Sequence, residues 1–350
     1  MQVSLKALLA DKPIEASAPC RIDAGGTWDI KAMALPLQKI NPVTVNIALD
    51  LRTTVSLSPF EEGWVKISSE GFRKVEIHPK DSLPLTSTMG PFFAAVSYFG
   101  FHGIWIHIRS GSPVRSALGG SSTALVALLK ALAKAFHRLE RENLTRSEIV
   151  HLAYHLEDGV SGGNCGLQDH MAAAYGGVNQ YVWQYGNRTT PFKKHPLLDR
   201  TGQQDLSKRL LVAYSGRTHV SSSINRNWIK DFLSGKTRSG WIRVNETVRR
   251  FAGAVREKDW QRSAALLREE MALRRRLTPE AMTPVTKKLV AQAESNGCGA
   301  RFAGAGAGGS VWALGEADDI NRLKESWGGT LASIKGARIL ECRVDSVGVR

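Results

Sequence analysis

The sequence has 350 residues, of which 43% are hydrophobic, and its 47 Lys and Arg against 32 Asp and Glu give a formal net charge of +15. This composition excludes an intrinsically disordered chain, because disorder requires low hydrophobicity together with high net charge. Since a single core stops growing at about 250–300 residues, we expect two domains.

The cysteines and the apolar runs limit where the protein can work. The four cysteines stand far apart without a C-x-x-C pair, which argues against a zinc site and against a dense disulfide framework. The segment MQVSLKALLADKP lacks the apolar run of a signal peptide, and no stretch approaches the roughly 20 apolar residues of a membrane span. We therefore expect reduced thiols, a cytoplasmic location and no membrane partner.

The positive charge is concentrated in one part of the sequence. Residues 186–290 contain 23 Lys and Arg against 9 Asp and Glu. Such a segment attracts anions, whether phosphorylated small molecules, nucleic acid or acidic lipid. Because the apolar residues between Val244 and Arg276 recur at helical spacing, we interpret most of these cations as exposed helix faces.

The first predicted elements are strands, which show period-two alternation or enrichment in β-branched residues. They cover residues 44–48, 53–57, 64–67 and 103–108. Two helices follow, a run of helix-forming residues at 125–136 and a second segment at 147–157. Thr145 or Ser147 can cap the second helix, with Glu148 close behind.

Residues 186–204 contain two Pro, two Gly and several polar residues, which predicts a linker between two halves. Beyond it we expect a strand at 209–214, helical structure at 244–276 and a strand at 311–314. The second half is thus α+β, and the domains are predicted as residues 1–205 and 206–350.

The glycine-hydroxyl motif, residues 113–125, carries the strongest functional pattern. In it Gly119 and Gly120 precede two Ser and a Thr and lead directly into the helix. Bare backbone N–H groups and the positive end of a helix favour an anion, and a hydroxyl can reach a phosphate oxygen or its Mg²⁺. The motif is neither the Lys-containing P-loop nor G-x-G-x-x-G after a strand. An ordinary N-capped helix behind a flexible loop explains the same residues equally well.

The C-terminal glycine motif, residues 299–314, places five glycines ahead of an apolar strand. Glycine lets the backbone approach a ligand or another loop closely, and here the glycines alternate with small rather than polar residues. We therefore expect a packed functional loop rather than a long flexible turn.

The N-terminal motif, residues 18–29, combines one cation and two carboxylates around Gly25 and Gly26. A carboxylate can accept hydrogen bonds from two hydroxyls at once, so Asp23 and Asp29 are candidate sugar contacts. Two Asp that cap turns around the glycine pair are the alternative, and the commoner arrangement.

Taken together, the three motifs resemble the signature set of the GHMP kinases in order and in spacing. They begin at Ala18, Pro113 and Gly299, so the resemblance spans nearly the whole chain. It implies an α+β, two-domain GHMP kinase fold with ATP bound between the domains. The N-terminal α/β domain would be like domain 2 of a small-subunit ribosomal protein, and the C-terminal domain would be ferredoxin-like.

Two further segments look like the sugar-kinase branch of that family. Residues 164–177 are similar to the segment that bears the catalytic Asp in galactokinases, fucokinases and bacterial heptose 7-phosphate kinases. Residues 211–224 resemble the strand and loop that follow the domain boundary in the heptose kinases. Among these branches the heptose 7-phosphate kinases fit best.

The resemblance assigns roles residue by residue. It implies that Asp169 is the catalytic carboxylate and that Arg21 keeps it ionised and neutralises the transferring group. The Mg²⁺ ligands would be Ser122, with Ser121 as a near equal, and Glu157. The ATP-binding residues would be Pro113, Leu118, Gly119, Gly120, Ser121, Ser122 and Thr123. The C-terminal loop would use Gly304, Gly306, Gly308 and Gly309, and the substrate contacts would be Asp23, Gly26, Thr27, Asp29, Arg217 and His219.

Without the resemblance, Glu157 is interpreted as an exposed acid at a helix end and Asp169 as a helix cap. The N-terminal motif also departs from the family pattern. Cys20 stands where a Gly is usual, and the span from Arg21 to Asp29 is one residue shorter than in the heptose and fucose kinases.

We thus expect an ATP- and Mg²⁺-dependent kinase of a sugar or sugar phosphate, with the anomeric hydroxyl of a heptose 7-phosphate as the preferred acceptor. Arg217 and Arg226 in the basic half offer countercharge for a second phosphate. The alternatives are a kinase of a neutral sugar such as fucose or galactose, a kinase of another alcohol, and a non-catalytic regulator that binds ATP and sugar. A nucleic-acid partner is disfavoured, because no aromatic residues interleave with the basic clusters. The oligomeric state does not follow from the sequence.

Overall fold

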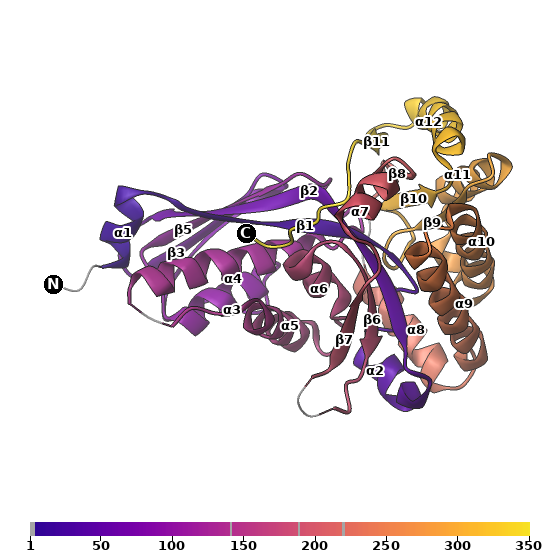
Figure 1. Ribbon diagram of the computed structural model, residues 1–350. Helices are drawn as coiled ribbons and strands as arrows, with labels where there is room; N and C mark the ends of the chain where they lie inside the picture. The colour runs from indigo at the N-terminus through magenta and orange to yellow at the C-terminus, as the bar shows by residue number, and fades with distance from the viewer. Residues whose placement is uncertain (1–3, 141, 188–189, 219–220) are drawn as a thin grey trace.

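Two sheets, one in each half of the chain, form the framework of the protein (Figure 1). The computed structural model describes residues 4–140, 142–187, 190–218 and 221–350. The first sheet contains β1 (Ile14–Ala24), β2 (Val43–Pro59), β3 (Trp64–Ser69), β4 (Phe72–Pro79), β5 (Ile104–Ser110), β6 (Val178–Trp183) and β7 (Phe192–Pro196). The second contains β8 (Leu210–Tyr214), β9 (Gly299–Phe302), β10 (Ser310–Leu314) and β11 (Arg338–Leu340).

The long strand β2 organises the first sheet, whose order is β4-β3-β5-β2-β6-β7 with β1 paired to β2. β2 is one strand of 17 residues, so the prediction of separate strands at 44–48 and 53–57 was wrong. The register of β1 against β2 shifts between Pro19 and Cys20, where a proline has no N–H to donate to the ladder. Just beyond this bulge, the backbone N–H of Arg21 donates to the carbonyl of Leu118, 3.1 Å away. The bulge thus joins the N-terminal motif to the glycine-hydroxyl motif.

Helices cover one face of the first sheet (Figure 1). α4 (Gly120–Arg138) packs against β1 and β2, with α3 (Gly90–Phe99), α5 (Arg146–Ser161) and α6 (Gln168–Tyr175) beside it. The predicted cap of α5 is confirmed, because the side chain of Thr145 accepts from the N–H of Glu148 and the Glu148 carboxylate accepts from the N–H of Thr145. The remaining short helices of this half are α1 (Leu5–Asp11), α2 (Lys31–Ala34) and η1 (Leu35–Ile40).

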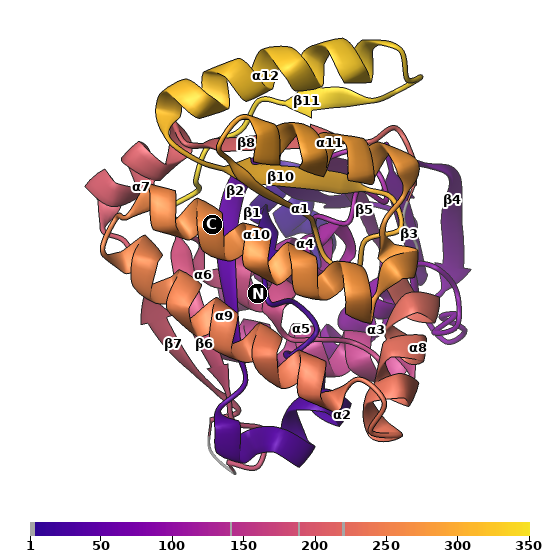
Figure 2. The ribbon, with the colours of Figure 1, turned by 90° about the vertical axis from the view of Figure 1, so that its right-hand side faces the viewer.

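The second sheet has the order β11-β8-β10-β9, and its strand pairs are antiparallel. Its helices are α8 (Ser221–Leu233), α9 (Arg238–Arg256), α10 (Trp260–Leu277), η2 (Pro279–Ala281), α11 (Pro284–Ser295) and α12 (Ala317–Ala332). α9 and α10 lie side by side (Figure 2). α10 also packs against β9. The stretch predicted as helical at 244–276 is therefore two helices, which separate where Lys258 takes a left-handed conformation and Asp259 caps α10.

The segment 186–204, predicted to be a linker, instead holds the edge strand β7 and the start of α7 (Arg200–Ser207). Pro196 ends β7, a position that tolerates a residue without an N–H. The first sheet therefore closes at Pro196 and the second opens at Leu210. No helix among the described residues is both long and apolar enough to cross a bilayer.

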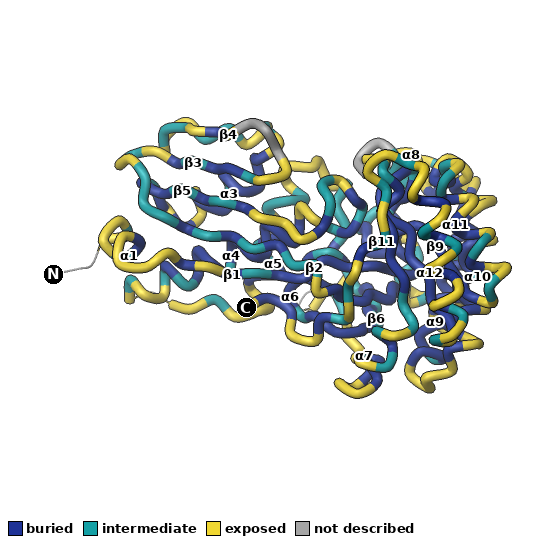
Figure 3. Tube along the Cα trace, turned by 90° about the horizontal axis from the view of Figure 1, so that it is seen from above, coloured by how far each residue is buried: buried dark blue, intermediate teal, exposed yellow. Residues whose placement is uncertain are grey.

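The last residues of the chain leave the second sheet and return to the first. The backbone of Asp50 donates to the carbonyl of Arg343, and Ser17 and Arg350 exchange two backbone hydrogen bonds. Buried apolar side chains from both halves form one continuous cluster, and exposed residues concentrate on loops and outer turns (Figure 3). The two halves are thus packed as one body, in the α+β class that the sequence predicts.

Candidate active site

One cavity of about 650 Å³ collects residues from all three motifs. The N-terminal motif contributes Arg21, Thr27 and Asp29, and the C-terminal glycine motif contributes Gly304. From the glycine-hydroxyl motif and the segment that follows α4, the lining includes Pro113, Gly119, Gly120, Ser121, Ser122, Glu157 and Asp169. The structure thus brings together most of the residues selected from the sequence.

Arg21 and Asp169 form a close ion pair in the cavity wall. Arg21 Nε donates to Asp169 Oδ1 over 2.7 Å, and Nη2 lies 2.6 Å from the same oxygen. Nη1 donates to the carbonyl of Ala117, 2.8 Å away. Arg21 is 4% exposed, whereas the Asp169 side chain keeps 22% of its surface accessible. The carboxylate is therefore held from one side and open to the cavity on the other.

The ionisation of this pair differs from that of free side chains. Burial raises the pKa of the Asp169 carboxyl above its ordinary value, and the positive charge of Arg21 only partly offsets that effect. Burial lowers the pKa of Arg21, but the charges of Asp169 and Asp23 outweigh it and raise the pKa above its ordinary value. Arg21 therefore stays cationic, while Asp169 becomes a stronger base than an exposed Asp.

Helix α4 begins at the cavity, earlier than the predicted residue 125. Its N-cap residue, Gly119, is left-handed with φ +78°. No side-chain hydrogen bond caps this end of α4. A Cβ on Gly119 would lie 3.1 Å from Asp169 Oδ2, so glycine is needed both for the backbone angle and for room. The first N–H groups of a helix lack helical partners and can therefore bind an anion. Behind them Leu118 and Thr123 are buried, and the Thr123 hydroxyl donates to Pro19 O over 3.4 Å.

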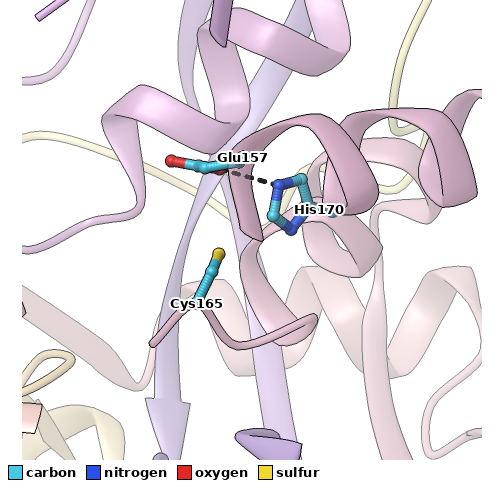
Figure 4. Close-up of side chains that lie close together, drawn as sticks. All are labelled: Glu157, Cys165 and His170. Atoms are coloured by element: carbon cyan, nitrogen blue, oxygen red, sulfur yellow. Dashed lines mark ion pairs between the residues drawn. The ribbon is translucent and has the colours of Figure 1, made fainter. Parts of the chain in front are cut away.

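Glu157 lines the cavity and is held by Ser122 and His170. Figure 4 shows the contact between His170 and the Glu157 carboxylate. His170 Nε2 and the Ser122 hydroxyl each lie 2.7 Å from Glu157 Oε2. Burial would raise the pKa of Glu157, but the hydrogen bonds from His170 and Ser122 outweigh it and lower the pKa. An ionised carboxylate next to a hydroxyl is a donor set of hard oxygens, which fits Mg²⁺. Cys165 Sγ lies within 4.8 Å of the Glu157 and His170 ligand atoms, but a thiol does not suit that cation.

Asp29 also lines the cavity, and among the described residues its hydrogen-bond donors are backbone groups. Its two oxygens accept from the backbone N–H groups of Thr27 and Gln168, both over 3.1 Å. Gly166 makes the approach possible, because a Cβ there would stand 1.8 Å from Asp29 Oδ2. Burial, followed by the charge of Asp169, raises the pKa of Asp29 to about 7. Asp29 can therefore be protonated or ionised near neutral pH.

Other residues selected as substrate contacts lie away from the cavity wall. Asp23 is fully buried, and its oxygens are taken by Arg301 and by the backbone N–H of Gly304. Gly26 packs on Asp23, where a Cβ would lie 2.2 Å from Asp23 Oδ2. Arg217 is exposed and outside the lining, although its carbonyl accepts from Gly309 N. His219 lies outside the described residues.

The glycines of the C-terminal motif pack against other loops. A Cβ on Gly309 would lie 2.7 Å from the Ala117 Cβ, and one on Gly306 would lie 2.7 Å from the Ala281 Cβ. A Cβ on Gly308, whose φ is +133°, would lie 2.8 Å from the carbonyl oxygen of Thr218. The motif therefore closes the cavity by tight contact with the glycine-hydroxyl motif, as expected of a packed loop.

Several lining residues were not selected from the sequence. An apolar part of the cavity includes Met89, Phe92, Ile108 and Val114, and its polar part includes Asn164, Gln168 and Asn225. Met89, Phe92 and Ile108 lie outside the motifs, whereas Val114 lies in the glycine-hydroxyl motif and Asn164 and Gln168 lie in the segment 164–177. Arg301 was also missed, although it lies inside the C-terminal glycine motif.

Comparison with known proteins matches both halves of the chain to one family. Residues 88–177 match the GHMP kinases N terminal domain, and residues 251–332 match the GHMP kinases C terminal domain. Over 209 residues the chain is 25% identical to the D-glycero-alpha-D-manno-heptose 7-phosphate kinase of Campylobacter jejuni. That match covers 59% of this chain and 60% of the relative, so it spans less than two thirds of either protein.

Solved structures resemble the chain over nearly its full length. Lactococcus lactis galactokinase complexed with galactose has a TM-score of 0.74 at 16% identity, covering 97% of this chain and 95% of that one. A D-glycero-D-manno-heptose 1-phosphate kinase from Bacteriodes thetaiotaomicron has a TM-score of 0.71 at 16% identity, covering 96% and 98%. These likenesses confirm the predicted two-domain fold. Both domains of the GHMP kinase family are thus present, in order, on that fold.

Proposed function

We propose that the protein is a sugar kinase, which transfers the γ-phosphate of ATP to a hydroxyl of its substrate with the help of Mg²⁺. The observation that carries this proposal is the Arg21–Asp169 pair beside Gly119 at the start of α4. Phosphoryl transfer to an alcohol needs a base for the hydroxyl proton and positive charge near the moving group. The pair supplies both within one cavity.

In the proposed reaction, Asp169 accepts the proton of the sugar hydroxyl as the hydroxyl oxygen attacks the γ-phosphorus. A new oxygen–phosphorus bond forms while the bond from the γ-phosphorus to the bridging oxygen breaks, and ADP leaves with that electron pair. Arg21 offsets the negative charge on the transferring group. The raised pKa of Asp169 suits a residue that must take up a proton.

The phosphates and the cation are assigned to the same end of the cavity. The N–H groups that open α4 would hold the phosphate chain. Ser122 and Glu157 would hold Mg²⁺, which when bound offsets phosphate charge. His170 keeps the Glu157 carboxylate in place, over 2.7 Å.

Two acceptor classes are proposed for the sugar. The likeness to a heptose 7-phosphate kinase favours the anomeric hydroxyl of a heptose 7-phosphate. One observation favours a neutral sugar such as galactose or fucose instead. Among the described residues that line the cavity, the cationic side chains are Arg21 and Arg115, and both adjoin the proposed ATP end. A second phosphate on the sugar would need a countercharge from elsewhere.

The test measures ADP release from ATP and Mg²⁺ over a panel of neutral hexoses, 6-deoxyhexoses, heptoses and heptose 7-phosphates. A strong response to one sugar supports the proposal, and a preference for the phosphorylated heptose over the free heptose decides between the two acceptor classes. ATP binding without sugar-dependent ADP release across the panel would contradict a kinase role and support a regulator.

A further inference from the structure

A line of alternating buried charges runs from the second sheet to the Arg21–Asp169 pair. Arg301, on β9, lies between Asp23 and Glu270, and Asp23 lies two residues along β1 from Arg21. The order of the charges is Glu270, Arg301, Asp23, Arg21 and Asp169. The first four residues are between 0% and 4% exposed. Charges this deep are stable only when each keeps its partner.

Asp23 contacts both arginines of this line, Arg301 and Arg21. Its Oδ2 lies 2.7 Å from Arg301 Nη1, and its backbone carbonyl accepts from the same guanidinium. Its Oδ1 accepts from the N–H of Gly304 over 2.7 Å and lies 3.5 Å from Arg21 Nη1. Burial would raise the pKa of Asp23, but Arg301 and Arg21 lower it below the ordinary value. One ionised carboxylate therefore holds β9, the C-terminal glycine loop and Arg21 together.

The distances show which partner holds Asp23 most firmly. Arg301 Nη1 lies 2.7 Å from Asp23, whereas Arg21 Nη1 lies 3.5 Å from it. The short hydrogen bonds of Arg21 go to Asp169 and to the Ala117 carbonyl. Because Asp23 is satisfied by Arg301, it does not compete with Asp169 for Arg21. Without Arg301, the buried Asp23 carboxylate would lack its closest partner, and Arg21, 3.5 Å away, would be the nearest cation to replace it.

We propose that Arg301 is a positioning residue, which acts through Asp23 to keep Arg21 engaged with Asp169. The inference rests on the proposed roles of Arg21 and Asp169 in phosphoryl transfer. It makes the reaction depend on the second sheet, because Arg301 and Gly304 reach Asp23 only when that sheet is docked. A displacement of about 1 Å at the reacting groups costs roughly a hundredfold in rate.

The first experiment replaces Arg301 in the full chain and follows turnover of the best sugar substrate. Arg301→Met is expected to lower kcat about a hundredfold while the KM for ATP stays within about threefold. The double variant Asp23→Asn with Arg301→Met removes the competing charge and should recover at least about tenfold of kcat. Arg274 remains one turn along α10 as a countercharge for Glu270 in both variants. Arg301→Lys, which keeps the charge, should fall between wild type and Arg301→Met.

The matched control is Arg274→Met, a second buried arginine of the same region. Arg274 lies over the rings of Trp228 and Trp241, 4.4 Å from each centroid, and its hydrogen bond reaches Gly26 O rather than Asp23. This variant should lose thermal stability and keep kcat within about threefold of wild type. If Arg274→Met lowers kcat as much as Arg301→Met does, general loosening explains the effect and the proposal fails.

A second measurement reads the arrangement without turnover. The Nε–H of Arg21 donates to Asp169, so its NMR resonance in arginine-labelled protein, assigned by its loss in Arg21→Lys, reports that contact directly. The resonance should shift in Arg301→Met and return toward its wild-type position in the double variant. An unchanged resonance, or a kcat within about threefold of wild type for Arg301→Met, would overturn the proposal. If the wild-type protein phosphorylates no sugar, the proposed function fails, and the resonance still decides the role of Arg301.

Discussion

Asp23 and Asp29 stand six residues apart in the N-terminal motif and have opposite surroundings. Asp23 is enclosed by Arg301, Arg21 and a backbone N–H, and its pKa is lowered. Asp29 accepts from two backbone N–H groups, faces the cavity, and has its pKa raised to about 7. The first carboxylate has the pairing of a structural group, and the second has the unbalanced charge typical of functional sites. The contrast separates two residues that the sequence presented as equivalent.

The largest expected effect is on kcat and comes from replacing Asp169, which lines the same cavity as Asp29. Asp169→Asn should lower kcat by about three orders of magnitude or more and leave ATP affinity nearly unchanged, because an amide cannot accept the hydroxyl proton. Steady-state kinetics and ATP titration measure the two quantities. Asp158→Asn, the same substitution in an acid that pairs with Lys31 over 3.0 Å, is the control and should stay within about tenfold of wild type. A near-normal kcat for Asp169→Asn would remove it from the role of base.

Asp23, the enclosed carboxylate, should contribute more to the free energy of unfolding than Asp29. Asp23→Asn leaves the buried Arg301 with a neutral partner, which is expected to cost about 3–5 kcal/mol in the free energy of unfolding. Asp29→Asn should cost only about 1 kcal/mol, because the loss of a buried unpaired charge offsets the lost hydrogen bond. Denaturant unfolding of both variants at pH 8 compares them directly. Equal losses would mean that the two carboxylates do not differ as described.

Glu157 is a further carboxylate that lines the cavity, and its proposed role is to bind Mg²⁺. Glu157→Gln should raise the Mg²⁺ concentration for half-maximal rate at least about tenfold, because a neutral amide is a poorer ligand for Mg²⁺ than a carboxylate. Glu148→Gln makes the same substitution on the same helix, at the N-terminal capping box of α5. It should leave the Mg²⁺ titration unchanged. Coincident titrations of wild type and Glu157→Gln would argue that Glu157 is not a ligand.

The smallest expected effect is a pH dependence due to Asp29. Its pKa is about 7 in the folded protein against an ordinary value of 3.8, so between these values the folded state holds a proton that the unfolded state has lost. The contribution of Asp29 to the free energy of unfolding therefore falls as pH rises from about 4 to about 7, and it is fully lost above that range. Asp29→Asn lacks this dependence. The stability difference between wild type and Asp29→Asn should change over this window and level off above it, and a constant difference would refute the raised pKa.

Local signals in the sequence predicted much of the fold and of the cavity. The capping box at Thr145 and Glu148 predicted the start of α5, since both partners lie within one helical turn. Glycines followed by hydroxyls predicted a helix start at the cavity, because that chemistry is contained in a few adjacent residues. The merging of two predicted strands into β2 was not predictable, because pairing with β1, β5 and β6 decides it.

Contacts between distant residues set the limit of sequence reasoning here. Asp23 and Arg301 are 278 positions apart, and no local pattern shows that β9 delivers a guanidinium to β1. The Pro and Gly content at 186–204 suggested a linker, whereas the edge of β6 recruits that segment as β7. Tertiary pairing overrides local preference in both cases.

The return of residues 343–350 to the first sheet has a consequence for how the protein is made. The backbone N–H of Ser17 donates to the carbonyl of Arg350, and the Ser17 carbonyl accepts from the N–H of Arg350. The ribosome adds Arg350 after the whole second sheet. During synthesis, this part of β1 therefore waits without its final neighbour, and an uncovered strand edge is where chains associate wrongly. The order of translation thus makes residues 343–350, which follow the second sheet, complete a sheet that begins near residue 14.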